Sequence, residues 1–326
     1  MVGARSFIGQ HLIRKLIDNG DHVTGLFRKR PDKAEKWMKD VKVASGDITE
    51  KSSIAGICKE IEIVYHLAAK VHDFSNKGNT ADEHSAVNVS GIKNVLDECI
   101  NSGIKHFVYF SSVKAMAEER GNNLDETFSP SPETPYGKSK LEAEKAVEDY
   151  GGKYKFKTTS LRLPLVYGPG NKGNIYRMIE AIDRGRFVMI GRGDNRRSMV
   201  YVENVVDAAI SVVNNSRADS SVYIVTDGID YSLKELYETI SKGLGKRTRS
   251  FFIPMGLARG LAVIGGIAGS IIGKQVPFNS NILEKLTGTY TFSSLKIQRE
   301  PGFKPRYNLY NTINDTINWY KTVRHV

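Results

Sequence analysis

The sequence has very little cysteine, and its histidines do not show the spacing typical of metal ligands. Only Cys58 and Cys99 are cysteines among 326 residues, and they stand far apart in no pair motif. This excludes a disulfide-rich secreted scaffold and predicts two buried thiols in a reducing compartment, hence a cytoplasmic protein. The seven histidines form no ligand pattern, so we expect no metal site.

The chain also lacks a long hydrophobic run. Its most apolar stretch, residues 260–273, is bracketed by Arg259 and Lys274 and is shorter than the ~20 residues that a membrane span requires. We expect a buried helix there, with contact to a membrane surface as the alternative. No signal peptide is expected, because Gly3 to Arg5 follow almost directly after Met1.

Acidic residues are fewer than basic ones, and the net charge is +11. The basic residues are scattered and no nucleic-acid motif is present, so we expect no nucleic-acid partner. A lysine-rich surface that keeps the protein dissolved is one interpretation. An anionic small substrate such as a diphosphate fits the charge equally well. Forty per cent of the residues are apolar, which is ample for a core.

Strand and helix patterns alternate along the chain, which predicts an α/β fold with a parallel, doubly wound sheet. We expect residues 1–164 to form the cofactor-binding domain, with 200–227 returning to it. Residues 165–199 and 228–326 are expected to form a smaller, mostly helical substrate domain. The predicted strands are 22–27, 41–44, 61–69, 105–110, 159–163 and 221–225.

Small residues at Gly3, Ser6 and Gly9 lead into an amphipathic helix. Such a loop lets backbone N–H groups approach a phosphate, and the helix N-terminus favours the anion. A loop of this kind should follow a buried strand, yet only Met1 and Val2 precede it. The central strand of the sheet is therefore expected to be missing and to lie upstream.

The end of the second predicted strand favours NADP(H). Phe27 stands where an NAD-preferring site offers an acidic residue to the ribose 2′-hydroxyl, and Arg28 follows it. An arginine there accommodates a 2′-phosphate. The alternative is that Arg28 is a solvated loop charge.

A tyrosine and a lysine four residues apart, Tyr136 and Lys140, open a predicted helix. They share one helical face, and an ammonium beside a phenol lowers the phenol pKa, which suits proton transfer next to a carbonyl or alcohol. Ligands of doubly wound sheets bind at the carboxyl ends of the strands. The glycine loop, Asp47, Ala68–Ala69 and Ser112 all hold that position, so we interpret the Tyr-Lys pair as part of a site.

Two adjacent arginines, Arg196 and Arg197, follow the turn-rich segment 164–170. Their forked hydrogen bonds would suit a diphosphate, and a basic surface turn is the alternative.

With these motifs in place, the chain resembles the extended short-chain dehydrogenase/reductase family, in its nucleotide-sugar epimerase/dehydratase branch. The resemblance covers nearly the whole chain and implies a Rossmann-type domain that holds NAD(P). The ordered motifs are Gly3-x-x-Ser6-x-x-Gly9, Gly46-Asp47, His66-Leu67-Ala68-Ala69, Asn88-Val89-x-Gly91, Ser111-Ser112, Tyr136-x-x-x-Lys140, Val166-Tyr167-Gly168-Pro169-Gly170 and Arg197-Ser198-x-Val200-Tyr201-Val202.

The resemblance implies roles for individual residues. Tyr136 would be the base at the sugar C4, Lys140 would bind the nicotinamide ribose, and Ser112 would hold the substrate oxygen. The family commonly dimerises through two helices, here near 85–101 and 137–150. The implied cofactor-binding residues are Gly3, Ser6, Phe7, Ile8, Gly9, Arg28, Asp47, Ile48, Leu67, Ala68, Ala69, Asn88, Tyr136, Lys140 and Leu163. The implied substrate-binding residues are Lys70, Ser111, Ser112, Asn174 and Arg197.

The sequence departs from the family pattern at two places, and the second of them argues against one of the family's reactions. Ser6 replaces the middle glycine of the loop, and Val113-Lys114 replace the Asp-Glu pair that 4,6-dehydratases carry after the catalytic Ser or Thr. Dehydration is therefore not expected. A 4-epimerase of a nucleotide-diphosphate sugar is favoured over an NADPH-dependent 4-ketoreductase. A non-catalytic NADP-sensing protein and an enzyme for steroid-type or lipid-linked substrates are the remaining alternatives.

Overall fold

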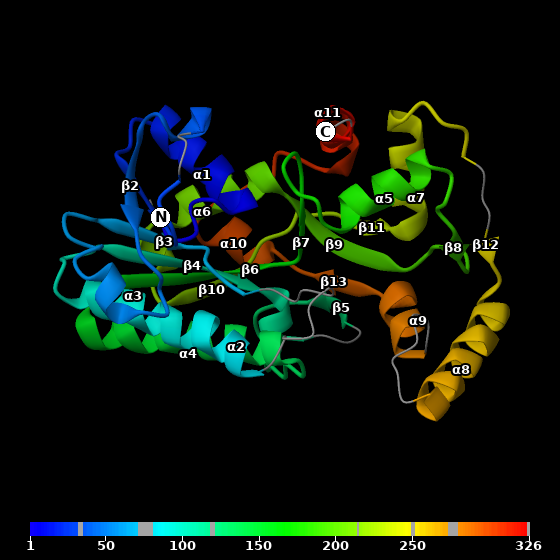
Figure 1. Ribbon diagram of the computed structural model, residues 1–326, viewed down its shortest axis with the longest axis horizontal. Helices are drawn as coiled ribbons and strands as arrows, with labels where there is room; N and C mark the ends of the chain where they lie inside the picture. Colours follow the sequence, from blue (N-terminus) through cyan, green and yellow to red (C-terminus); the bar gives the residue numbers. More distant parts are fainter. Residues whose placement is uncertain are drawn as a thin grey trace.

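The computed structural model of the protein describes residues 1–31, 35–70, 81–117, 121–213, 215–248, 252–272 and 280–324. Two groups of elements lie side by side along the long axis of the molecule (Figure 1). The first is a parallel sheet with helices on both faces, and the second is a smaller mixed unit that holds most of the later part of the chain.

The parallel sheet confirms the predicted fold. Its strands run in the order β10-β6-β4-β3, and β1 pairs with β2 beside them, every pair being parallel. The strands are β1 (Val23–Phe27), β2 (Val41–Ser45), β3 (Ile63–His66), β4 (His106–Ser112), β6 (Lys157–Leu163) and β10 (Ser221–Ile224).

Met1 and Val2 lie between β1 and β3, where the central strand was expected to be missing. Val2 forms parallel bridges to Leu26 and to His66. Its N–H donates to the Tyr65 carbonyl at 2.9 Å, and its carbonyl accepts from Leu67 N–H at 2.8 Å. Two residues thus hold the central position and join the two halves of the sheet, and they form only isolated bridges where a full central strand was expected to be missing.

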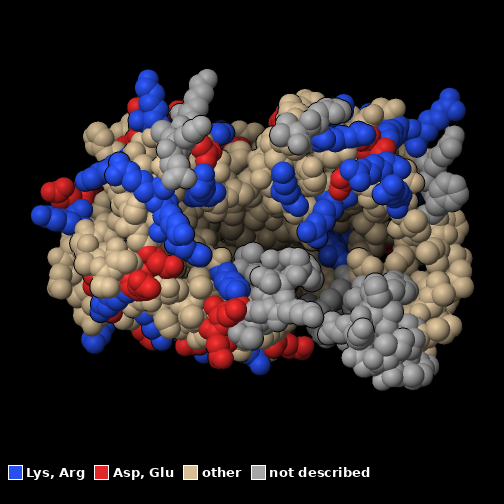
Figure 2. Space-filling model, viewed as in Figure 1, with Lys and Arg blue, Asp and Glu red and all other residues tan. Residues whose placement is uncertain are grey.

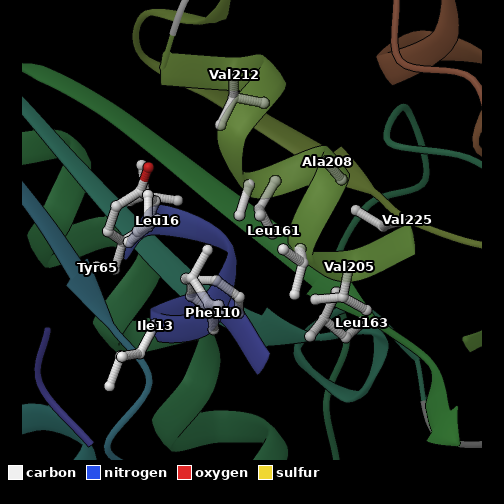
Figure 3. Close-up of a cluster of buried hydrophobic side chains, with 14 of the residues drawn as sticks. Ile13, Leu16, Tyr65, Phe110, Leu161, Leu163, Val205, Ala208, Val212 and Val225 are labelled. Atoms are coloured by element: carbon white, nitrogen blue, oxygen red, sulfur yellow. The ribbon is translucent and has the colours of Figure 1, made fainter. Parts of the chain in front are cut away.

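Helices cover both faces of this sheet, as the alternating pattern predicts. Helices α1 (Phe7–Asp18) and α6 (Val202–Val213) pack on one face, and α3 (Gly91–Ile100) and α4 (Pro135–Tyr154) on the other. Figure 3 shows α1 and α6 placing Ile13, Leu16, Val205, Ala208 and Val212 against apolar side chains of the strands. The core fixes the strand ends, which is where the candidate site lies.

Cys58 and Cys99 are buried, as predicted, and they also meet. Both are free thiols, and their Sγ atoms lie 3.2 Å apart beneath α3. Nothing in their sequence separation indicates this contact, because it depends on how α3 packs on the sheet.

The second unit is built around a small sheet rather than helices alone. Strand β9 (Arg196–Tyr201) pairs with β11 (Asp230–Ser232), β13 (Tyr290–Phe292) and β7 (Leu165–Tyr167). Strand β5 (Gly121–Leu124) pairs with β13, although it lies within the predicted 1–164 domain, so the domain boundaries stay a prediction. The surrounding helices are α5 (Asn174–Asp183), α7 (Leu233–Gly243) and α11 (Leu309–Val323), whereas α10 (Leu295–Arg299) packs beside β10 of the parallel sheet.

A buried carboxylate, Asp227, ties the two units together just after β10. It accepts hydrogen bonds from the hydroxyls of Tyr167 and Tyr231 at 2.8 and 3.0 Å. Tyr201 N–H and the Asn204 amide donate to its other oxygen at 2.7 and 2.8 Å. Burial raises the Asp227 pKa to about 6. The hydrogen bonds act in the opposite direction and lower this pKa.

The apolar stretch forms a helix, α8 (Met255–Ile272), but the prediction that it is buried is wrong over its described side chains. Leu257, Leu261 and Ile264 are exposed, and only Ala258 and Ala262 are buried, against Leu283 of α9 (Ser280–Thr287). The reason is position: α8 lies at one end of the molecule, beside α9 and the short pair β8 (Met189–Ile190) and β12 (Phe252–Ile253) (Figure 1). The side chains of 265–273 lie outside the described residues. Among the described residues, no helix is long and apolar enough to cross a membrane.

Candidate active site

Most of the predicted site residues follow the carboxyl ends of the parallel strands, and the molecule is hollowed between the two units. Figure 2 shows this recess near the middle of the molecule, edged by lysine and arginine side chains. The carboxyl ends of β1, β2, β3 and β4 deliver Arg28, Asp47, Ala68 and Ser112, and the loop before α1 reaches the same edge. The second unit contributes Asn174 and Arg197.

The glycine loop is packed so tightly that side chains would not fit at its two glycines. Gly3 has φ +85°, and a Cβ there would lie 2.8 Å from the Ala68 nitrogen; one on Gly9 would lie 2.7 Å from the Gly3 carbonyl oxygen. Ser6, which departs from the usual glycine, caps α1: its Oγ accepts from Gly9 N–H at 3.1 Å. The first turn of α1 carries no acidic residue. A helix N-terminus approached by bare backbone fits a pyrophosphate, and Phe7 and Ile8 continue this turn.

Arg28 and Asp47 face each other at the ends of β1 and β2. The Arg28 Nε lies 3.5 Å from Asp47 Oδ2, and the arginine side chain is 75% exposed. The other Asp47 oxygen accepts from the Thr49 N–H and hydroxyl, which hold the Asp47 pKa below its ordinary value. An exposed ion pair of this kind is weak, so Arg28 can turn to another anion. Ile48 is buried, and it contacts Gly91 of α3.

Asn88 connects the end of β3 to the start of α4. It lies in a π-helical turn, η3 (Ala86–Ser90), which follows α2 (Ala81–Ser85). Its amide donates to the Lys70 carbonyl and to Ser139 Oγ, and it accepts from Lys70 N–H at 2.7 Å. Ser139 Oγ in turn donates to the Tyr136 carbonyl at 2.8 Å. Asn88 therefore positions the backbone at Tyr136, and the Lys70 ammonium pairs with Glu83.

Tyr136 and Lys140 lie in the first turns of α4, as predicted. Thr134 caps this helix, since its Oγ1 accepts from Gly137 N–H at 3.1 Å. The Lys140 side chain is 2% exposed; its Nζ donates to the Phe110 carbonyl at 2.7 Å and lies 4.4 Å from the centre of the Tyr109 ring. Burial lowers the Lys140 pKa to about 7, while the Glu144 carboxylate opposes this shift.

Ser112 and Ser111 end β4 and point in opposite directions, as successive strand residues do. Ser112 pairs in register with Leu163 on β6, and its Oγ accepts from Lys114 N–H at 3.2 Å. Ser111 is buried, and its hydroxyl donates to Glu144 Oε1 at 2.5 Å. The expectation that Ser111 binds substrate is therefore withdrawn, because its hydroxyl belongs to the packing beneath α4.

Arg197 is turned into the molecule, whereas Arg196 pairs at the surface with Glu235. The Arg197 guanidinium lies 5.3 Å from the centre of the Tyr290 ring and donates to the Leu286 carbonyl at 3.4 Å. Desolvation lowers the pKa of Arg197. Asn174 is exposed at the first position of α5. The two adjacent arginines thus have different environments, and only Arg197 fits an inward-facing ligand.

Three side chains near Tyr136 and Lys140 were not predicted. Lys114 Nζ lies 5.9 Å from the centre of the Tyr136 ring, and the His84 ring centre is also 5.9 Å away. Glu144 lies one turn beyond Lys140 on α4. Its i+4 spacing from Lys140 is a signal that the sequence carries; the contact of His84 depends on how α2 packs against α4, which no local pattern reports.

The buried ammonium of Lys140 predicts an unusual dependence of stability on pH. The Lys140 pKa of about 7 in the folded state lies below the ~10.4 of an unfolded lysine. The unfolded state therefore binds more protons between these values, and the folded state gains stability as pH rises through them. We expect Lys140→Met to be more stable than wild type at pH 6, by on the order of 3 kcal/mol.

This difference should shrink as pH rises toward about 10, and urea unfolding at several pH values measures it. The exposed Lys145 of the same helix supplies the control, because Lys145→Met should show no such pH dependence. Parallel stability curves for wild type and Lys140→Met would contradict the expected shift.

Comparison with known proteins places this geometry among characterised relatives. The model of a family described as the NAD dependent epimerase/dehydratase family matches residues 1–225. The UDP-glucose 4-epimerase of Vibrio cholerae is 27% identical over 321 residues, covering 97% of this chain and 93% of that protein. The N-acetyl-alpha-D-glucosaminyl-diphospho-ditrans,octacis-undecaprenol 4-epimerase of Escherichia coli O157:H7 is 27% identical over 325 residues, covering 98% and 94%.

A solved structure shows the same fold. The UDP-glucose 4-epimerase of Thermotoga maritima, crystallised with UDP-glucose, is similar with a TM-score of 0.79 at 22% identity. The match covers 99% of this chain and 98% of that one. Both units are therefore shared with it, including the part of the chain beyond residue 225.

Proposed function

Because the chain belongs to the NAD dependent epimerase/dehydratase family, we propose that it is a 4-epimerase of nucleotide-linked sugars, of the UDP-glucose or UDP-N-acetylhexosamine type. The observation that carries the proposal is the pairing of Tyr136 with a buried Lys140 at the start of α4, beside the end of β4. Two full-length relatives named as 4-epimerases support the choice of reaction.

Each catalytic group has a distinct task. Tyr136 takes the proton from the sugar O4 and later returns it, which is general base and acid catalysis. The Lys140 ammonium favours the tyrosinate by its charge. Ser112 donates a hydrogen bond to the same sugar oxygen. A bound nicotinamide would supply a reversible hydride acceptor for the sugar C4, and inversion requires the 4-keto sugar to present its other face before the hydride returns.

The chain offers distinct groups for the cofactor. The backbone from Gly3 to Gly9 would hold the pyrophosphate, and Arg28 or Asp47 would contact the adenosine side. Leu67, Ala68 and Ala69 follow β3 next to Gly3, where backbone without bulky side chains lets a dinucleotide pass. Leu163 is buried at the end of β6, beside Ser112.

Arg197 and Asn174 are proposed to bind the diphosphate of the substrate. A guanidinium makes forked hydrogen bonds to phosphate oxygens, and Arg197 is the arginine that faces inward. A diphosphate is present both in UDP-sugars and in the undecaprenol-linked sugar that the Escherichia coli relative is named for. Arg197 therefore supports a substrate with a diphosphate, but it does not distinguish a UDP-sugar from an undecaprenol-linked sugar.

The residues after Ser112 favour epimerisation over dehydration. Val113 is buried and Lys114 lies against the Tyr136 ring. Neither can act as the carboxylic acid and carboxylate that remove water from a sugar. The proposed reaction thus needs only hydride and proton transfer at C4.

An NADPH-dependent 4-ketoreductase is the second candidate, and Arg28 is the observation that favours it. If Arg28 binds a 2′-phosphate, Arg28→Ala should weaken NADPH binding by about tenfold and leave NADH binding unchanged. Isothermal titration with both dinucleotides measures this, with the nearby Arg30→Ala as control. Equal weakening for both dinucleotides, or for neither, would remove the support for NADP(H).

The nicotinamide that co-purifies with the protein tests the proposed function. Mass spectrometry of the released nucleotide, together with a panel of UDP-sugars, distinguishes the candidates. Tightly held NAD and interconversion without added cofactor support the epimerase. Exchangeable NADP(H), consumed by a 4-keto sugar, would support the reductase. Dinucleotide binding with no turnover of any sugar would contradict both enzymatic functions and would favour a non-catalytic sensing role.

A further inference from the structure

Helix α8 presents a row of large apolar side chains to solvent. Leu257, Leu261 and Ile264 are spaced i, i+4 and i+7, so they share one face, and they are 58%, 46% and 65% exposed. Phe252 on the adjoining β12 is 60% exposed. We call these four residues the α8 patch. Scattered exposed apolar residues are normal, but an aligned row on one helix indicates a partner.

The sides of α8 away from this row pack against α9 or line a cavity. Ala258 and Ala262 pack against Leu283 of α9. Met255, Arg259 and Val263 line a cavity of about 690 Å³ that is shared with α9 and the start of β5. These three lie roughly half a turn from Leu257 and Leu261 on the helix. The α8 patch is therefore part of neither the packing against α9 nor the wall of this cavity.

The sequence around the α8 patch is strongly basic. Residues 244–289 contain six lysines and arginines but one acidic residue, Glu284, so this short stretch carries almost half of the net charge of +11. Among its described residues Lys246, Arg247 and Arg259 are exposed; Lys246 pairs with Asp183 at 3.0 Å, and Arg259 lies on the cavity side of α8. The helix lies at one end of the molecule, beside α9 and the short pair β8 and β12 (Figure 1).

We propose that α8 docks the protein on the surface of a membrane that contains anionic phospholipids, with the helix lying in the plane of the interface. An apolar helix face within a stretch of net positive charge gains from apolar burial among the acyl chains and from attraction of the stretch to anionic headgroups. Charge decides between this partner and a second copy of the chain. Two copies meeting at this face would bring two basic stretches together, which is unfavourable.

Vesicle flotation of the purified full-length protein tests the docking. Wild type is mixed with phosphatidylcholine vesicles that contain ~30% phosphatidylglycerol or none. We expect binding to the anionic vesicles, weakened as salt rises from about 0.1 to 0.5 M. The variant Leu261→Gln/Ile264→Gln should lose at least about tenfold in binding. Its matched control is Ile229→Gln/Leu295→Gln, two exposed apolar residues elsewhere, which should bind like wild type.

The outcomes separate the possible occupants. Absence of wild-type binding to anionic vesicles, or equal loss in both double variants, would overturn the proposal. A change in oligomeric state of Leu261→Gln/Ile264→Gln in sedimentation velocity, without any vesicle binding by wild type, would assign the patch to a second copy instead. Since the α8 patch contains no proposed catalytic or binding residue, turnover of a soluble sugar nucleotide should be the same in both double variants. Docking can therefore fail without affecting the proposed function.

Discussion

Replacing Tyr136 by phenylalanine should reduce turnover by about a thousandfold while the protein stays folded. The substitution removes one oxygen, and with it the group that exchanges the proton of the sugar O4; loss of such a general acid or base costs 10²- to 10⁴-fold. The ring contact with His84 is kept, so substrate affinity should change little. Steady-state kinetics with the sugar that the wild type converts gives kcat and KM separately.

The control for this variant lies on the same helix. Tyr154 packs against Tyr150 with tilted rings near the end of α4, far along the helix from Lys140, and Tyr154→Phe should keep wild-type kcat. If Tyr136→Phe retained kcat within about threefold, far short of the loss expected for a proton-transfer group, Tyr136 would not be the base. An increase in KM alone would indicate a binding role instead.

Replacing Glu144 by glutamine should destabilise the protein by about 3 to 5 kcal/mol, because it leaves a buried arginine without its charge partner. Glu144 and Arg162 form a two-armed ion pair at 3.0 and 2.8 Å, with both side chains 5% exposed. Ser111 donates to the same carboxylate. The Glu144 charge also raises the Lys140 pKa, so Glu144→Gln should lower the Lys140 pKa further.

Urea unfolding of three variants shows how much of the lost free energy of unfolding comes from the unpaired arginine charge. Arg162→Met combined with Glu144→Gln should be less destabilised than Glu144→Gln alone, because the unpaired charge is removed. Glu142, on the exposed side of α4, pairs with Lys93 at 3.7 Å, and Glu142→Gln should cost less than about 1 kcal/mol. If Glu142→Gln and Glu144→Gln lowered the free energy of unfolding equally, the buried ion pair would stabilise the protein no more than the exposed one.

The alternating pattern predicted the parallel sheet well, since each strand is an apolar run bounded by turn residues. The strand predicted at 105–110, with the two serines after it, is β4 (His106–Ser112), and the start of the Tyr136 helix followed from Pro135, whereas its end at Tyr154 did not follow from the pattern. The pattern failed where stability comes from distant contacts. Val2 forms a strand position only because β1 and β3 supply hydrogen bonds on both sides. For α8, composition predicted burial, but Leu257, Leu261 and Ile264 are exposed and no element of the described part of the chain is packed over them.

The candidate site was predicted as a set of strand ends, and most of its residues lie at the expected edge. Ser111 is the exception, because strand alternation sends its hydroxyl to Glu144 rather than toward the recess. Asn88 was expected to contact the cofactor, yet its amide is bound by Lys70 and Ser139. Such assignments depend on which neighbours a side chain finds. The homodimer through 85–101 and 137–150 stays a prediction.

In the proposed reaction, hydride leaves and returns at C4 of a nucleotide-linked sugar within one site. Purified protein, with no added dinucleotide, can be incubated with UDP-glucose and with UDP-N-acetylglucosamine carrying deuterium at C4, and the products followed by proton NMR. We expect the 4-epimer of one of them, with the deuterium retained at C4. Formation of the epimer with hydrogen from water at C4, or no epimer from either sugar, would contradict it.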